Sequence, residues 1–201
     1  MPGIGILGGT FDPVHLGHLI VGETARESLN LEKVLFMPAG QPWLKADRAL
    51  APAQHRLRMV ELAVEDNPCF QVSRHEVDRP GPTYTVDTLE AMRAELGQDV
   101  PLHFIMGQDA LGEFHRWKAP ERILDLCRLA VYPRPGGAAL EWREIFTRWS
   151  LPEWQVTLLR APLMGISGTD IRCRAAEGRS IRYLVPDAVR DYIQKQGLYL
   201  S

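Results

Sequence analysis

Short apolar runs alternate with longer amphipathic segments about six times along this chain, and no other feature of the sequence limits the fold as strongly. The apolar runs predict strands over residues 3–7, 34–37, 70–72, 102–106, 129–132 and 156–159. Apolar residues at helical spacing, bounded by Gly or Pro, predict helices over 15–29, 52–66, 85–96, after 120, 142–149, after 167 and 186–196. Such alternation favours parallel strands joined by helical crossovers.

The expected fold is therefore α/β: a Rossmann-like, doubly wound and mostly parallel sheet with helices on both faces. In sheets of this kind, ligands bind beyond the carboxyl ends of the strands. That rule places four segments along one rim, namely residues 8–18, the loop after Met37, residues 107–109 and the segment around Ser167.

Length and composition narrow the class of protein. A chain of 201 residues suits one domain, here 1–201. A formal net charge of −2 argues against a broad nucleic-acid surface, although a local basic pocket could bind a small polyanion. Cys69, Cys127 and Cys173 are odd in number and lack metal spacing, which predicts reduced thiols in a cytoplasmic protein. No apolar stretch reaches the length of a membrane span, so we expect no membrane partner.

The first motif, residues 8–18 with the sequence GGTFDPVHLGH, follows the first predicted strand. Gly8 and Gly9 are expected to break that strand and to let the backbone approach a bulky ligand. The helix start that follows supplies free amides suited to phosphate, and His15 and His18 could donate to phosphoryl oxygens. Taken alone, the glycine pair could be an ordinary turn, and either histidine an ordinary surface or core residue. The motif matches neither G-x-G-x-x-G nor a Walker loop.

The second motif, residues 166–172 with the sequence ISGTDIR, lies near the other end of the chain. Ser167 and Thr169 are good capping residues for a helix start, and Arg172 lies about one turn further on. Helix amides together with a guanidinium would hold phosphate groups. Alone, this segment also fits an ordinary capped helix with a surface arginine.

Together, these motifs resemble the two signatures of the HxGH nucleotidyltransferase superfamily. More closely, the chain resembles the family of bacterial nicotinate-nucleotide adenylyltransferases. Residues 84–89 (YTVDTL), residues 104–109 (FIMGQD) and Trp117 are similar to segments typical of that family. The similarity spans nearly the whole chain.

The resemblance implies adenylyl transfer from ATP to nicotinate mononucleotide, giving deamido-NAD and pyrophosphate by direct in-line attack. It implies a single nucleotidyltransferase domain in which the C-terminal helices, about 166–197, complete the ATP site. The implied catalytic residues are His15, His18 and Arg172. The implied ATP-binding residues are Gly8, Gly9, Thr10, Phe11, His15, His18, Lys45, Ser167, Thr169 and Arg172.

For the acceptor, the resemblance implies that Trp117 stacks on the nicotinate ring and that amides near Thr85 and Lys118 bind its carboxylate. Asp109, after Gly107, is expected to bind a ribose hydroxyl. Mg²⁺ is the expected cofactor; it would be carried by the ATP phosphates, with no metal site formed by protein residues. The expected partners are the two substrates, without nucleic acid, and a homo-oligomer is left open.

One loop departs from the family pattern. Many relatives carry P-P-H-K or P-P-H-R after the second strand, whereas this chain has QPWLK at 41–45. Lys45 keeps the cation, and Leu44 replaces the histidine. Two other functions stay open: another adenylyltransferase of the superfamily, acting on nicotinamide mononucleotide or phosphopantetheine, and a nucleotide-binding sensor without turnover.

Overall fold

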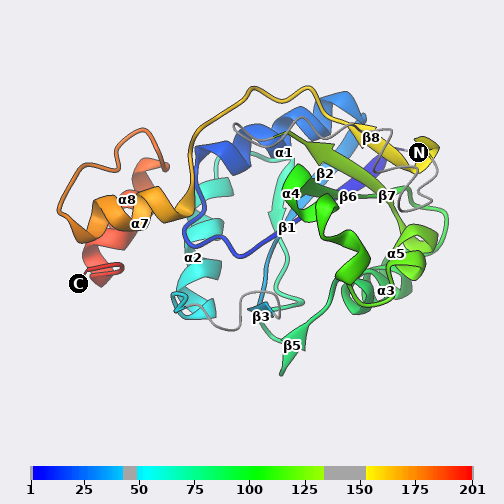
Figure 1. Cartoon of the computed structure of the whole chain (residues 1–201), viewed down its shortest axis with the longest axis horizontal. Helices are drawn as coiled ribbons and strands as arrows, with labels where there is room; N and C mark the ends of the chain where they lie inside the picture. The colour runs from blue at the N-terminus through cyan, green and yellow to red at the C-terminus, as the bar shows by residue number, and fades with distance from the viewer. Residues whose placement is uncertain (1, 43–48, 134–152, 201) are drawn as a thin grey trace. The chain divides into compact units, whose positions relative to one another are not determined.

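The computed structural model describes residues 2–42, 49–133 and 153–200. Its main sheet has six strands in the order β4-β2-β1-β6-β7-β8 (Figure 1). The strands are β1 Gly3–Gly9, β2 Leu31–Pro38, β4 Phe70–Val72, β6 Leu102–Gly107, β7 Arg128–Tyr132 and β8 Val156–Leu158. β1, β6, β7 and β8 pair in parallel, so their carboxyl ends share one edge. The predicted α/β fold with a mostly parallel, Rossmann-like sheet is confirmed.

Helices join the strands, and all of those described except the helix Gln108–Gly112 lie where the amphipathic segments predict them. They are α1 Leu16–Ser28, α2 Ala53–Val64, α3 Thr85–Leu96, α4 Gln108–Gly112, α5 Pro120–Leu126, α7 Gly168–Ala176 and α8 Asp187–Gln196. Two short 3-10 helices, η2 Phe114–Arg116 and η3 Glu153–Gln155, lie between them. α3 packs against α5 (Figure 1), and Arg93 of α3 donates to the Leu126 carbonyl at 2.6 Å.

The core of the sheet comes from the apolar runs themselves. In β6 every residue is buried, as expected for a strand covered on both sides. In β1, Gly5 leaves room for its neighbours: a Cβ there would lie 2.8 Å from Leu31 Cδ1 and 3.0 Å from Ile105 Cδ1. The missing side chain therefore lets large residues from β2 and β6 close over the central strand.

Several predicted boundaries were wrong. Gly8 and Gly9 do not break the first strand but continue it, because glycine tolerates extended backbone when neighbouring strands supply partners. Thr85 is not the N-cap of α3; Tyr84 takes that position, with no capping bond from its side chain. The sequence also gave no signal for the two-residue strands β3 Gln41–Pro42 and β5 Pro82–Thr83, which pair with each other. The predicted helix 142–149 lies outside the described residues.

The chain divides into two compact units, each described by itself. One unit comprises Met1–Leu7, Val21–Val34 and Tyr84–Gly165, and the other comprises Gly8–Ile20, Leu35–Thr83 and Ile166–Ser201. We call them the acceptor unit and the phosphate unit, after the site residues predicted in each. Both sequence motifs lie in the phosphate unit.

Candidate functional site

The first motif runs from the end of β1 to the first turn of α1. Gly8 and Gly9 are the last two residues of β1, and Thr10 and Phe11 follow directly. Phe11 is buried and adopts a φ of 50°, which is uncommon for a residue with a bulky side chain. His15 comes immediately before Leu16, the first residue of α1. The two predicted catalytic histidines thus flank the helix start.

His15 and His18 form one packed pair. Their rings stack with centroids 3.7 Å apart, and the ring of Phe11 meets His18 edge-on at 4.9 Å. The backbone N–H of His15 donates to Nδ1 of His18 at 3.2 Å. This bond makes Nδ1 an acceptor and so assigns the ring proton of His18 to Nε2. His18 therefore presents one defined N–H donor.

The second motif contacts the first within the phosphate unit. Ser167 caps α7 as predicted, because its Oγ accepts the N–H of Asp170 at 3.1 Å. Arg172 Nη1 donates to the backbone carbonyl of Asp12 at 2.7 Å, and Nη2 to Thr169 Oγ1 at 3.3 Å. Gly168 permits this approach, since a Cβ there would lie 2.8 Å from the same Asp12 carbonyl oxygen.

Asp12 is a buried carboxylate to which the sequence assigned no role. Its Oδ1 accepts the hydroxyl of Tyr199 at 2.7 Å and the N–H of Ala51 at 3.3 Å. Its Oδ2 lies 3.7 Å from Arg172 Nη1. Burial and the bond to Asp12 raise the pKa of Tyr199, so the hydroxyl stays protonated and donates.

Arg56 of α2 holds the backbone around the first motif and was also missed. It is 2% exposed, and burial lowers its pKa while Asp12 raises it. Its guanidinium donates to four backbone carbonyls, those of Thr10 (2.7 Å), Ala39 (2.7 Å), Gly40 (3.0 Å) and Ala51 (2.9 Å). The signal was present in the sequence, because Arg56 shares a helix face with Met59 and Val60, where a cation is unexpected. Tyr199 has no such signal.

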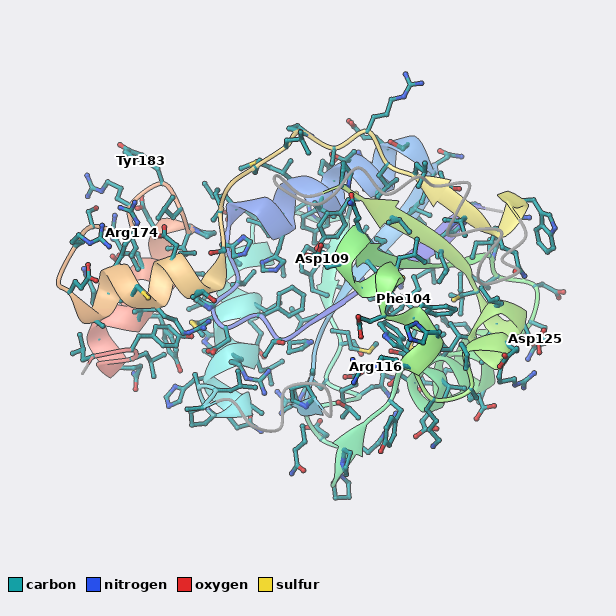
Figure 2. The ribbon with its side chains drawn as sticks, in the orientation of Figure 1. Phe104, Asp109, Arg116, Asp125, Arg174 and Tyr183 are labelled. Carbon is teal, nitrogen blue, oxygen red and sulfur yellow. The ribbon has the colours of Figure 1, made fainter. Side chains whose placement is uncertain are left out.

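In the acceptor unit, Trp117 rests on the core. Its ring meets Phe104 edge-on at 5.8 Å and Phe114 at 5.6 Å in a tilted arrangement. Figure 2 labels Phe104, on β6, and Arg116, at the end of η2 just before this tryptophan. Within the described residues, the buried Nε1 of Trp117 has no hydrogen-bond acceptor. The ring is half-buried.

Lys118 and the start of α3 are brought together. Lys118 Nζ pairs with both oxygens of Asp87, at 2.9 and 3.1 Å, and lies 4.8 Å from the ring centroid of Tyr84. These partners flank Thr85, the first residue of α3, where a helix leaves amides without intrahelical partners. The Lys118 side chain is therefore engaged with the first turn of α3.

Three predicted site residues remain, namely Gly107, Asp109 and Lys45. Gly107 ends β6, and Asp109 lies exposed in the first turn of α4 (Figure 2). Lys45, with the rest of the 43–45 loop, lies outside the described residues. The structure thus joins the second motif to Asp12 of the first motif through Arg172 and Gly168, and it brings Lys118 to the first turn of α3.

Over residues 2–42, 49–133 and 153–200, no three His, Cys, Asp or Glu side chains gather in a metal-binding cluster. Over the same residues, no helix is long and apolar enough to cross a membrane. Among the described residues, the Arg172 and Arg56 guanidinium groups lie close to the Asp12 carboxylate at the first motif.

Comparison with known proteins gives one consistent result. The model of the family described as cytidylyltransferase-like matches residues 6–174. A protein of Thermomicrobium roseum named probable nicotinate-nucleotide adenylyltransferase is 48% identical over 199 residues, covering 99% of this chain and 92% of that protein. A Roseiflexus protein of the same name is 48% identical over 197 residues, covering 98% of this chain and 97% of its own length.

Solved structures agree at the level of the fold. The nicotinic acid mononucleotide adenylyltransferase of Plasmodium falciparum, complexed with NaAD, matches with a TM-score of 0.81 at 19% identity. The match covers 99% of this chain and 98% of that one. The same enzyme complexed with APC matches with a TM-score of 0.79.

Proposed function

The chain belongs to the cytidylyltransferase-like family, and on this premise we propose that it is a nicotinate-nucleotide adenylyltransferase of NAD biosynthesis. It transfers the adenylyl group of ATP to nicotinate mononucleotide and forms deamido-NAD and pyrophosphate. The observation that carries the proposal is the 48% identity, over 99% of this chain, with a relative named probable nicotinate-nucleotide adenylyltransferase. The contact between the two phosphate motifs, through Arg172 and Asp12, supports it independently.

The reaction needs no covalent enzyme intermediate. A phosphate oxygen of the mononucleotide attacks the α-phosphorus of ATP in line. The new P–O bond forms as the bond to the bridging oxygen of the β-phosphate breaks, and that oxygen leaves with pyrophosphate. Such a reaction asks the protein for positioning and for stabilisation of developing charge.

In our proposal the phosphate unit positions ATP and stabilises the charge that develops on its phosphates. His18 donates from Nε2 to the α-phosphate as charge develops there, and His15 contacts the triphosphate. The backbone from Gly8 to Phe11, with the Thr10 hydroxyl, lies along the same phosphates. The start of α7, with Ser167 and Thr169, and the Arg172 guanidinium hold the β- and γ-phosphates that leave. Lys45 would add a further cation.

The acceptor unit would hold the mononucleotide. We assign stacking on the nicotinate ring to Trp117, whose half-buried ring is fixed by Phe104 and Phe114. Backbone amides at Thr85 and Lys118 would bind the ring carboxylate, which favours the acid over the amide form of the nucleotide. Asp109, after Gly107, would bind a ribose hydroxyl.

We propose that Mg²⁺ enters with ATP as part of the substrate complex. The residues around the first motif offer cations and amides, which fit phosphate oxygens better than they fit a metal ion. A single domain spanning 1–201, a cytoplasmic location, action without nucleic acid and the oligomeric state remain predictions of the sequence.

A substrate panel tests the function. Purified protein is given Mg-ATP with nicotinate mononucleotide, nicotinamide mononucleotide or phosphopantetheine, and pyrophosphate release is measured. We expect the highest kcat/KM with nicotinate mononucleotide. A preference for either other acceptor would move the chain to another adenylyltransferase, and ATP binding without release in any arm would make it a sensor.

A further inference from the structure

Tyr199 joins the carboxy-terminal segment to the first motif. It follows α8, which ends at Gln196 and is capped by Gly197, and it adopts a φ of 65°, an uncommon conformation for an aromatic residue. Its hydroxyl donates to Asp12 Oδ1 at 2.7 Å across 187 residues of sequence. Such a strained backbone persists where surrounding contacts hold it, and it is a reason to look for a functional role.

The carboxylate that Tyr199 binds has a second oxygen facing a cation. Asp12 Oδ2 has no hydrogen-bond donor among the described residues, and it lies 3.7 Å from Arg172 Nη1. The Asp12 side chain is only 3% exposed, so solvent does little to satisfy it. Arg172, by contrast, is 30% exposed and already bonds the Asp12 backbone carbonyl. Arg172 is thus poised between Asp12 and any anion that enters from solvent.

We propose that Tyr199 is a positioning residue for the ATP site. By bonding Oδ1, it fixes the rotation of the Asp12 carboxylate so that Oδ2 stays beyond hydrogen-bond distance of Arg172. The guanidinium then remains available to the triphosphate. This inference rests on the proposed function, because it takes ATP as the ligand of Arg172.

The negative charge of Asp12 explains why loss of the Tyr199 hydroxyl should lower the affinity for ATP. A hydrogen bond from a hydroxyl disperses negative charge on a buried carboxylate. Without that bond, Asp12 would be held only by the N–H of Ala51 at 3.3 Å and would turn Oδ2 toward Arg172 to form a direct ion pair. Incoming ATP would have to break this pair first, so its affinity would fall.

The test is Tyr199→Phe, which removes the hydroxyl and keeps the ring. We expect the KM for ATP to rise about three- to tenfold, the range of one net hydrogen bond, with the KM for the mononucleotide unchanged. Tyr183→Phe is the matched control, because Tyr183 is 79% exposed on the loop between α7 and α8 (Figure 2). A general loss of structure would raise the KM for both substrates. The ratio of the two KM values therefore separates a specific effect on ATP from a loss of stability.

A double-mutant cycle tests whether Tyr199 acts on ATP affinity through the charge of Asp12. Asp12→Asn removes the charge that attracts Arg172, so adding Tyr199→Phe in that background should cause no further loss of ATP affinity. The dissociation constant of a non-hydrolysable ATP analogue is measured by calorimetry without the acceptor. The inference therefore stays testable even if no deamido-NAD forms and the proposed function fails. Additive effects, equal shifts in both Michaelis constants, or a Tyr199→Phe variant no different from Tyr183→Phe would overturn it.

Discussion

At the scale of single residues, the stacked histidine pair has a defined hydrogen-bond arrangement. The bond from the His15 N–H to His18 Nδ1 leaves Nε2 of His18 as its donor. The sequence predicted both histidines, because their spacing is part of a recognisable motif. It could not predict Asp12, Arg56 or Tyr199 as partners, since their contacts depend on which distant segments the fold brings together.

We predict that His18→Ala lowers kcat about 100-fold or more, since one lost donor to developing charge is worth about 3 kcal/mol. The dissociation constant for ATP should change far less, because the ground state carries less charge at that oxygen. Steady-state kinetics and calorimetry measure the two effects. His115→Ala, at an exposed position, is the control. Equal losses in turnover and in binding would contradict the assigned role.

Trp117 is predicted to act through binding alone. Trp117→Ala should chiefly raise the KM for the mononucleotide, because stacking stabilises the ground and transition states alike. Since the ring also packs on Phe104 and Phe114, stability will fall too. Phe114→Leu serves as the control for lost packing, as Phe114 is buried. If the ATP constant alone changed, or if both variants raised the mononucleotide constant equally, stacking on the ring would be refuted.

At the scale of elements, periodicity located most strands and helices, and pairing between distant segments decided the rest. β6 and β7 are continuous apolar runs and were placed almost to the residue. The extension of β1 through Gly8 and Gly9 was missed, because glycine signals a turn unless tertiary pairing overrides it. β3 and β5 are only two residues long each and exist through mutual pairing, which no local pattern reports.

Arg56 shows how one helix can stabilise a loop. Arg56→Met should lower the free energy of unfolding by about 3 kcal/mol or more, because four buried or partly buried backbone carbonyls lose their charged donor. Chemical denaturation measures this change. Arg58→Met, on the same helix, is the control, since Arg58 is 52% exposed and pairs only with Glu61 among the described residues. A similar, small loss in both variants would show that the four bonds contribute little.

β6 also carries a pH-sensitive side chain. Burial lowers the pKa of His103, and Arg128 lowers it further, so the unfolded chain binds this proton more readily than the folded one. The free energy of unfolding should therefore be at its full value above the ordinary histidine range and fall as the pH is lowered through it. Denaturation at a series of pH values measures the slope. His103→Gln should flatten it and His115→Gln should not; unchanged slopes in both would exclude His103 as the source.

At the scale of the whole molecule, each unit contains a coherent group of predicted site residues. The residues that bind phosphate in our proposal lie together in the phosphate unit, and those that bind the acceptor lie in the acceptor unit. The sequence assigned these roles through its resemblance to a known family, whereas the rule that ligands bind at strand ends pointed only to residues 8–18, the loop after Met37, residues 107–109 and the segment around Ser167. Lys45, which the resemblance also assigns to ATP, lies outside the described residues.

The cysteines give a probe of the whole fold. Burial raises the pKa of Cys127 to about 12, and its Sγ lies 3.5 Å from the Ile123 carbonyl oxygen, whereas Cys173 is exposed. Iodoacetamide at about pH 8 should modify Cys173 in the native protein and Cys127 only on unfolding. Mass spectrometry across a denaturant series measures both. Modification of Cys127 well before the unfolding transition would show that α5 opens locally.

The lack of space around Gly5 should restrict how the sequence can change at this position. A methyl group at this position would collide with Leu31 and Ile105, both of which come from neighbouring strands. An alanine should therefore be tolerated only where one of those two side chains is smaller. Among related sequences, we expect the three positions to covary, so that the cavity vacated by one residue is filled by another.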